Sequence, residues 1–144
     1  MAVVNADGAG CEKLISGYCA VVNFFNTKQQ LITYGAMLNH SVPRAELMAV
    51  VEGLRLVYES EMFFDGISVL ILSDCETVVK SARGVAKRSK HKDLWFLYDF
   101  YDTKMAIDIL HIPRDLKGDH QTCDHHASCL REILKDYREN VFEN

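Results

Sequence analysis

The sequence is poor in the residues that interrupt regular structure. It contains only 2 prolines and 8 glycines among 144 residues, and 49% of its residues are hydrophobic. This composition argues against a disordered or low-complexity chain, because such chains are richer in proline and glycine or lack enough apolar residues for a core. The length suits one core. We therefore expect residues 1–144 to form a single domain without a linker or repeat.

The sequence also has none of the segments that direct a chain into or across a membrane. No apolar run approaches the roughly 18 residues of a membrane span. Residues 1–7 have no basic start followed by an apolar stretch, so they do not resemble a signal peptide. Five cysteines, an odd number, indicate free thiols rather than a disulfide framework. We expect a cytoplasmic protein with no membrane partner, and no obligate protein partner is evident.

Negative charge predominates, but positive charge gathers in one short segment. The net charge is −4, from 16 basic and 20 acidic residues. Between residues 80 and 92 there is no acid and there are six bases, namely Lys80, Arg83, Lys87, Arg88, Lys90 and Lys92. The rest of the chain has 10 basic against 20 acidic residues, a charge of −10. A basic segment on an acidic body favours contact with nucleic-acid phosphates, and a solvated loop is the alternative.

Hydrophobic periodicity predicts the element order β-β-β-α-β-α-α-β-α. The predicted strands are residues 1–6, 16–25, 30–38, 67–72 and 105–112, and the predicted helices are residues 43–58, 75–82, 93–102 and 121–137. In the third of these helices, Leu94, Leu97, Tyr98 and Tyr101 are expected on one side. Residues 67–72 are almost continuously apolar, which is typical of a central strand covered on both faces. The order predicts an α/β fold with a five-stranded mixed sheet and helices on both faces.

Four acidic residues are placed where this architecture would bring them together. We expect Asp7 to end the first strand, Asp74 to end the fourth, and Glu46 and Asp124 to lie in the first turns of helices. Taken singly, each could serve as a turn residue, a helix cap or a partner of a helix dipole. Taken together, they are expected to converge at one end of the sheet. Because clustered carboxylates repel one another, such a group indicates divalent cations, and two ions suit phosphodiester hydrolysis.

The residues around these acids resemble the motifs of type 1 ribonucleases H. The matching segments are residues 5–9 (NADGA), 17–22 (GYCAVV), 44–49 (RAELMA), 70–74 (LILSD) with Val78-Val79, 92–95 (KDLW) and 123–127 (CDHHA). They occur in the family's order and extend over nearly the whole chain. Each motif is short, so the ordered set is what makes the resemblance specific.

This resemblance implies a fold, a reaction and a set of site residues. It implies the ribonuclease H-like fold and endonucleolytic cleavage of the RNA strand of an RNA–DNA hybrid, with Mg²⁺ or Mn²⁺ and with 5′-phosphate and 3′-hydroxyl products. The implied metal ligands are Asp7, Glu46, Asp74 and Asp124. The candidate contacts to the hybrid, from the helix motif and the basic segment, are Arg44, Lys87, Arg88 and Lys90.

The segment before Asp124 resembles two subgroups of the family. Residues 111–115 (HIPRD) resemble a subgroup in which the arginine after the proline lies near the site, whereas residues 117–120 (KGDH) resemble one with a Lys-Gly-His loop. We favour His120 as the assisting catalytic residue, because imidazole can move protons near pH 7; Arg114 is the alternative. Cys123, His126 and Cys129 could share a helix face, but no second ligand pair with zinc-site spacing is present.

Three departures from the family pattern leave the substrate open. Residues 10–14 (GCEKL) replace a glycine-rich turn, Val42-Pro43 replaces polar residues before the first helix, and Glu76 stands where an amide is common. An acid beside backbone phosphates would repel them. Alternative functions are therefore a related nuclease acting on another structured nucleic acid, or a catalytically weak nucleic-acid-binding module.

Overall fold

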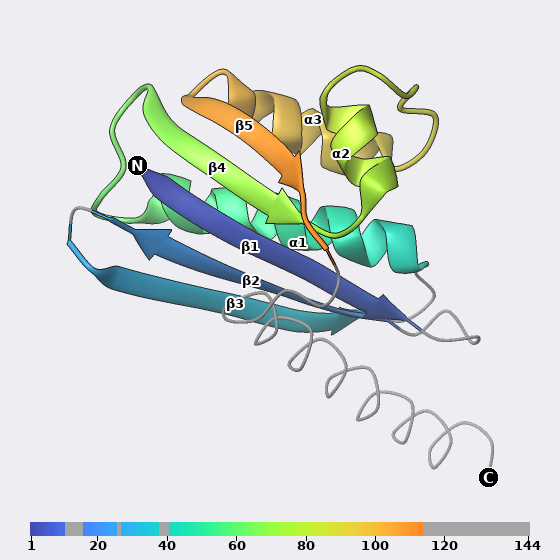
Figure 1. Cartoon of the computed structure of the whole chain (residues 1–144), viewed down its shortest axis with the longest axis horizontal. Helices are drawn as coiled ribbons and strands as arrows, with labels where there is room; N and C mark the ends of the chain where they lie inside the picture. The colour runs from blue at the N-terminus through green and yellow to red at the C-terminus, as the bar shows by residue number, and fades with distance from the viewer. Residues whose placement is uncertain (11–15, 26, 38–40, 114–144) are drawn as a thin grey trace, which may run out of the picture.

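The computed structural model describes residues 1–10, 16–25, 27–37 and 41–113. Its strands are β1 (Ala2–Gly10), β2 (Ser16–Phe24), β3 (Gln29–Met37), β4 (Ile67–Ser73) and β5 (Met105–His111), and its helices are α1 (Val42–Glu59), α2 (Glu76–Ala82) and α3 (Lys92–Asp102). The sheet has the order β3-β2-β1-β4-β5. β1 is antiparallel to β2 and parallel to β4, so the predicted five-stranded mixed sheet is confirmed (Figure 1).

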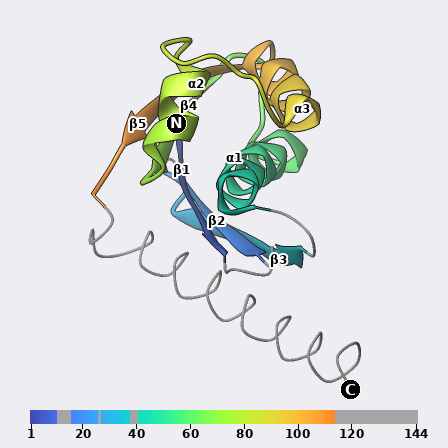
Figure 2. The same cartoon turned by 90° about the vertical axis from the view of Figure 1, so that its right-hand side faces the viewer.

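The three described helices contribute to one core on one face of the sheet. Alternate residues of β1, such as Val4 and Ala6, belong to the same buried cluster as Leu54 of α1, Val78 of α2 and Trp95 of α3. Figure 2 shows α1 and α3 on the same side of the sheet. The helix predicted at residues 121–137, which would supply the second covered face, lies outside the described residues. None of the described helices is long and apolar enough to cross a membrane.

β1 is longer than the sequence pattern predicted. It pairs with β2 along its whole length, from Ala2 opposite Phe24 to Gly10 opposite Ser16. Asp7 therefore lies within the strand, and the prediction that it ends the strand is wrong. Small residues such as Ala9 hid this extension, because they carry little strand signal and do not alternate in polarity.

α1 also begins earlier than predicted. Ser41 is its N-cap, and the Ser41 hydroxyl accepts a hydrogen bond of 3.4 Å from the backbone N–H of Arg44. The first turn consequently contains no acidic residue, and Glu46 is in the second turn. The prediction of Glu46 in the first turn was wrong, so a helix dipole does not account for this residue, because the dipole acts mainly within the first turn.

Two predicted burial patterns also differ from the structure. In α3, Leu97 is 41% exposed whereas Trp95 is 6% exposed, because Trp95 turns inward and packs edge-on against Tyr98 at a centroid distance of 5.3 Å. β4 lies between β1 and β5 as expected for an interior strand. However, Ser68 near the start of β4 is exposed, and Leu70 and Leu72 on the same face are only half-buried.

Two glycines allow α1 to lie unusually close to β1. A Cβ atom added at Gly8 would lie 2.6 Å from the backbone nitrogen of Glu46 and 2.7 Å from the carbonyl carbon of Ala45. At Gly53, on the helix itself, it would lie 2.4 Å from a methyl group of Val4. The methyl group could shift, whereas the backbone of α1 could not move without displacing the helix. Gly8 therefore fixes the distance between β1 and the start of α1.

Replacing Gly8 should consequently strain the contact between strand and helix. We expect Gly8→Ala to lower the free energy of unfolding by about 1–3 kcal/mol, the usual cost of overpacking. Urea denaturation of the variant and the wild type measures this difference. Ala106→Val, a larger addition at an exposed position of β5, is the control and should change stability little. Equal effects of the two substitutions would contradict a close approach at Gly8.

Candidate metal centre

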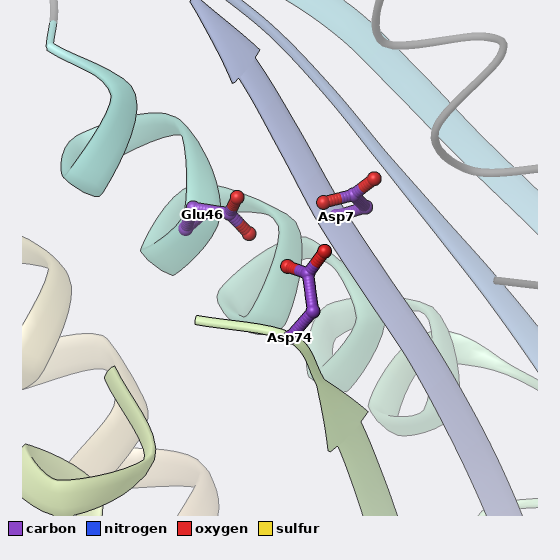
Figure 3. A group of neighbouring side chains, drawn as sticks. All are labelled: Asp7, Glu46 and Asp74. Carbon is purple, nitrogen blue, oxygen red and sulfur yellow. The ribbon is translucent and has the colours of Figure 1, made fainter. Parts of the chain in front are cut away.

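Three of the four predicted metal ligands come together. Asp7 from β1, Glu46 from α1 and Asp74 directly after β4 each offer a carboxylate oxygen, and these atoms lie within 4.8 Å of one another (Figure 3). The three residues are 2%, 3% and 9% exposed, respectively. Aspartate and glutamate are rarely buried to this extent unless their charge has a partner. The fourth predicted ligand, Asp124, lies outside the described residues.

The end of β4 explains why these side chains meet. The parallel pairing of β1 with β4 extends only to Ala6 and Ser73. The residues that follow, Asp7 and Asp74, are therefore neighbours at the point where the two strands separate. Because Gly8 has no side chain, the backbone of Glu46 can approach β1 at the same point. Functional groups commonly gather where neighbouring parallel strands end.

The chemistry of this group fits a hard divalent cation. All three ligands supply oxygen, which is the donor that Mg²⁺ and Mn²⁺ prefer. Negative charge at the site also acts on the adjacent thiol. Burial raises the pKa of Cys75, and the nearby Glu46 and Asp74 carboxylates raise it further. A bound cation would offset the mutual repulsion of the three acids.

Asp74 has two neighbours whose contacts the sequence did not indicate. The backbone N–H of Cys75 donates to the Ser73 hydroxyl at 3.1 Å, and Nε2 of His111 lies 3.2 Å from the backbone oxygen of Asp74. His111 is the last residue of β5 and pairs with Ser73. A register between β4 and β5 would have revealed this proximity, but periodicity alone does not provide a register.

Arg44, a predicted nucleic-acid contact, is bound within the protein. Its guanidinium donates two hydrogen bonds to the carboxylate of Asp93, at 3.0 and 2.6 Å, and lies 3.5 Å from Nδ1 of His91. The Arg44 side chain is only 18% exposed. This ion pair joins the start of α1 to the start of α3. It also lowers the pKa of Asp93 from its ordinary value of 3.8 to about 2.

The shifted pKa of Asp93 predicts a change in stability at acid pH. A carboxylate with a lowered pKa in the folded state stabilises the protein fully above its ordinary pKa, and this contribution is lost as the pH falls towards about 2. Asp93→Asn should therefore cost a constant amount near neutral pH, and the difference from wild type should shrink below about pH 4. Because the Asp93 side chain is 63% exposed, we expect at most about 1 kcal/mol. Urea midpoints at several pH values test this, and a pH-independent difference would contradict it.

Arg88, another predicted nucleic-acid contact, anchors the basic segment to the protein. It donates to the backbone oxygens of Ser81 at 3.0 Å and Ala82 at 3.4 Å, near the end of α2, and to the Asp99 carboxylate at 2.6 Å. Its guanidinium carbon also lies 4.2 Å from the centre of the Trp95 ring. These contacts engage much of its donor capacity, so Arg88 orders the segment between α2 and α3.

Lys87 and Lys90, the remaining two predicted contacts, are exposed. Both line a cavity of about 220 Å³ between α1, α2 and α3, together with Pro43, Thr77 and Trp95. Two residues of the cavity wall are close in sequence to the acids of the candidate metal centre: Leu47 follows Glu46, and Thr77 lies three positions after Asp74. Lys87 and Lys90 therefore belong to the wall of a cavity between the three described helices.

The remaining predicted site residues belong to the C-terminal part of the sequence. His120, the favoured assisting residue, and Arg114, its alternative, lie outside the described residues. Cys123, His126 and Cys129, the residues that could share a helix face as zinc ligands, also lie outside the described residues.

Comparison with solved structures identifies the fold. No family model matches the sequence, and no curated protein matches it either. The N-terminal RNase H domain of Rv2228c from Mycobacterium tuberculosis is similar, with a TM-score of 0.82, 19% identity, and coverage of 94% of this chain and 96% of that domain. LC11-RNase H1 in complex with an RNA/DNA hybrid has a TM-score of 0.75 and 14% identity, with coverage of 93% and 99%. RNase H1 from Halobacterium salinarum has a TM-score of 0.70 and 15% identity, with coverage of 92% and 98%. This chain therefore has the ribonuclease H fold that its ordered motifs indicated.

Proposed function

We propose that the protein is a metal-dependent endonuclease that hydrolyses the RNA strand of RNA–DNA hybrids. The observation that carries this proposal is the buried group of Asp7, Glu46 and Asp74 at the separation of β1 and β4. The ribonuclease H fold supports it, and LC11-RNase H1, which shares the fold, was solved with an RNA/DNA hybrid.

The acidic residues would act as metal ligands, and three of them already lie close together in the structure. Asp7, Glu46 and Asp74, with Asp124, would hold Mg²⁺ or Mn²⁺. Bound ions of this kind supply an activated water molecule and stabilise the leaving oxygen of a phosphodiester. Because Asp7 is within a strand and Glu46 within a helix, little rearrangement is needed to form the site. His120 would assist proton transfer or product release.

The cavity between α1, α2 and α3 would offer a route for the backbone of the substrate. Lys87 and Lys90 on its rim would contact phosphates, which positions a duplex without reading its sequence. Glu76, an acid near this path, forms an ion pair of 2.9 Å with Lys80. That lysine offsets part of the repulsion that Glu76 would exert on the substrate.

A cleavage assay with four substrates tests the proposal directly. Labelled RNA–DNA hybrid, double-stranded RNA, double-stranded DNA and single-stranded RNA would be incubated with the protein in Mg²⁺, in Mn²⁺ and in EDTA. We expect internal cleavage of the RNA in the hybrid, with 5′-phosphate ends, and no cleavage in EDTA. Preferential cleavage of another substrate would favour a related nuclease. Binding without cleavage in either metal would favour a binding module.

Removal of one metal ligand should abolish cleavage without unfolding the protein. We expect Asp74→Asn to reduce the rate on hybrid by at least about 1000-fold, or about 4 kcal/mol, because the amide keeps the shape but loses the anionic ligand. Without metal, the variant should be at least as stable as the wild type, since a repelling charge is removed. Asp108→Asn, an exposed acid of β5, is the matched control. Undiminished cleavage by Asp74→Asn would show that the assigned site is wrong.

Neutralising the two exposed lysines should weaken binding in a salt-dependent way. For Lys87→Gln/Lys90→Gln we expect weaker binding to all hybrid sequences alike. The slope of log affinity against log salt should become shallower by about 0.7–0.9 for each phosphate that the variant no longer neutralises. Arg88 is left intact because it anchors the segment. Fluorescence anisotropy with a labelled hybrid measures the slope.

The control for this variant is Lys28→Gln/Lys104→Gln, which removes the same charge from other parts of the surface. It should leave the slope nearly unchanged. Identical slopes for the two double variants would show that residues 87 and 90 are only solvated.

A further inference from the structure

The peptide group that joins Asp74 to Cys75 is held by a side chain at each of its polar atoms. Its N–H, which belongs to Cys75, donates to the hydroxyl of Ser73 at 3.1 Å. Its carbonyl oxygen, which belongs to Asp74, lies 3.2 Å from Nε2 of His111. Because a carbonyl oxygen only accepts hydrogen bonds, the Nε2 atom carries the proton in this contact. Both bonds act on one rigid plane.

Fixing this plane limits the conformation of Asp74. The orientation of the peptide sets the ψ angle of Asp74 and the φ angle of Cys75, which is the N-cap of α2 at φ −90°. No side-chain hydrogen bond caps α2 at this residue, so the cap itself does not hold the peptide in place. With its following peptide fixed, the direction in which the Asp74 carboxylate leaves the backbone is restricted.

The two side chains act where the sheet no longer holds the chain. Ser73 opposite His111 is the last pair of the ladder between β4 and β5, and the N–H of Ile112 then donates to the oxygen of Ser73 at 2.9 Å. Asp74 lies beyond this last bond of the sheet. The ring of His111 thus links β5 to Asp74, one residue beyond the last backbone pair of β4 and β5.

We propose that Ser73 and His111 are positioning residues that orient Asp74 for binding a divalent cation. This inference rests on the proposed function, because it assumes that Asp74 is a metal ligand. Neither residue is itself assigned as a ligand. Ser73 is fully buried, whereas His111 is exposed at the edge strand of the sheet. Loss of the His111 ring should therefore affect metal binding more than it affects folding.

The test compares metal binding with stability in four proteins. Isothermal titration with Mn²⁺, and separately with Mg²⁺, would be carried out on wild type, His111→Ala, His111→Gln and Leu110→Ala. We expect His111→Ala to weaken Mn²⁺ binding by about 10-fold, the lower end of the usual effect of losing a group that supports a metal ligand. His111→Gln should restore most of the affinity, because its side-chain N–H can reach the same carbonyl. Leu110→Ala, which trims the neighbouring residue of β5, should bind as the wild type does.

The hydroxyl of Ser73 provides an independent variant. Ser73→Ala should also weaken Mn²⁺ binding, and the effects of Ser73→Ala and His111→Ala should not be additive, since both act on one peptide. Urea denaturation of each metal-free protein reports whether folding is retained. If His111→Ala fails to fold, the Ser73→Ala and His111→Gln titrations still decide the question.

The outcomes separate this inference from the proposed function. A wild type that binds neither Mn²⁺ nor Mg²⁺ would overturn the proposed function and the inference with it. A wild type that binds metal, together with unchanged binding by His111→Ala and Ser73→Ala, would overturn the inference alone. Equal weakening in His111→Ala and His111→Gln would show that the hydrogen bond to Asp74 is not what matters, and would also overturn it.

Discussion

The point where β1 and β4 stop pairing determines where the acidic groups of the proposed site lie. Parallel pairing ends at Ala6 and Ser73, whereas β1 remains paired with β2 as far as Gly10. The next residue on each strand is an aspartate, and the start of α1 reaches the same point because Gly8 has no side chain. β1, α1 and the end of β4 thus hold together carboxylates that repel one another and that long flexible loops would allow to separate.

The same structure explains how an acidic protein can expose positive charge on one short segment. Arg44 and Arg88 are held by Asp93 and Asp99, so these arginines join elements of the fold. Arginine suits this role because its planar group forms several hydrogen bonds at once. Exposed lysines such as Lys87 extend from the segment that Arg88 anchors. Arg88 therefore orders the segment from which Lys87 and Lys90 line the cavity, and the net charge of the chain does not reveal this arrangement.

Periodicity and motif order were sufficient to predict the sheet, the described helices and the meeting of Asp7, Glu46 and Asp74. They were sufficient because apolar spacing identifies each element, and the element order restricts the ways in which strands can pair. The internal role of Arg88 could not be predicted, since its partners are chosen by tertiary placement. The inward face of α3 was mispredicted for a related reason. Leu97 and Trp95 fit the helical pattern almost equally, and packing decides between them.

Because the course of the backbone brings the three acids together, the candidate site requires particular residues at only a few positions. Solved structures with 14–19% identity share this fold at TM-scores of 0.70–0.82, and cores accept many combinations of apolar residues of similar volume. The candidate metal centre, by contrast, requires carboxylates at fixed positions and space for a helix at Gly8. This explains why the resemblance to ribonucleases H is carried by short motifs, four of which contain the acids. The departures at Val42-Pro43 and Glu76 lie outside the acidic cluster, so they bear on the substrate more than on the metal.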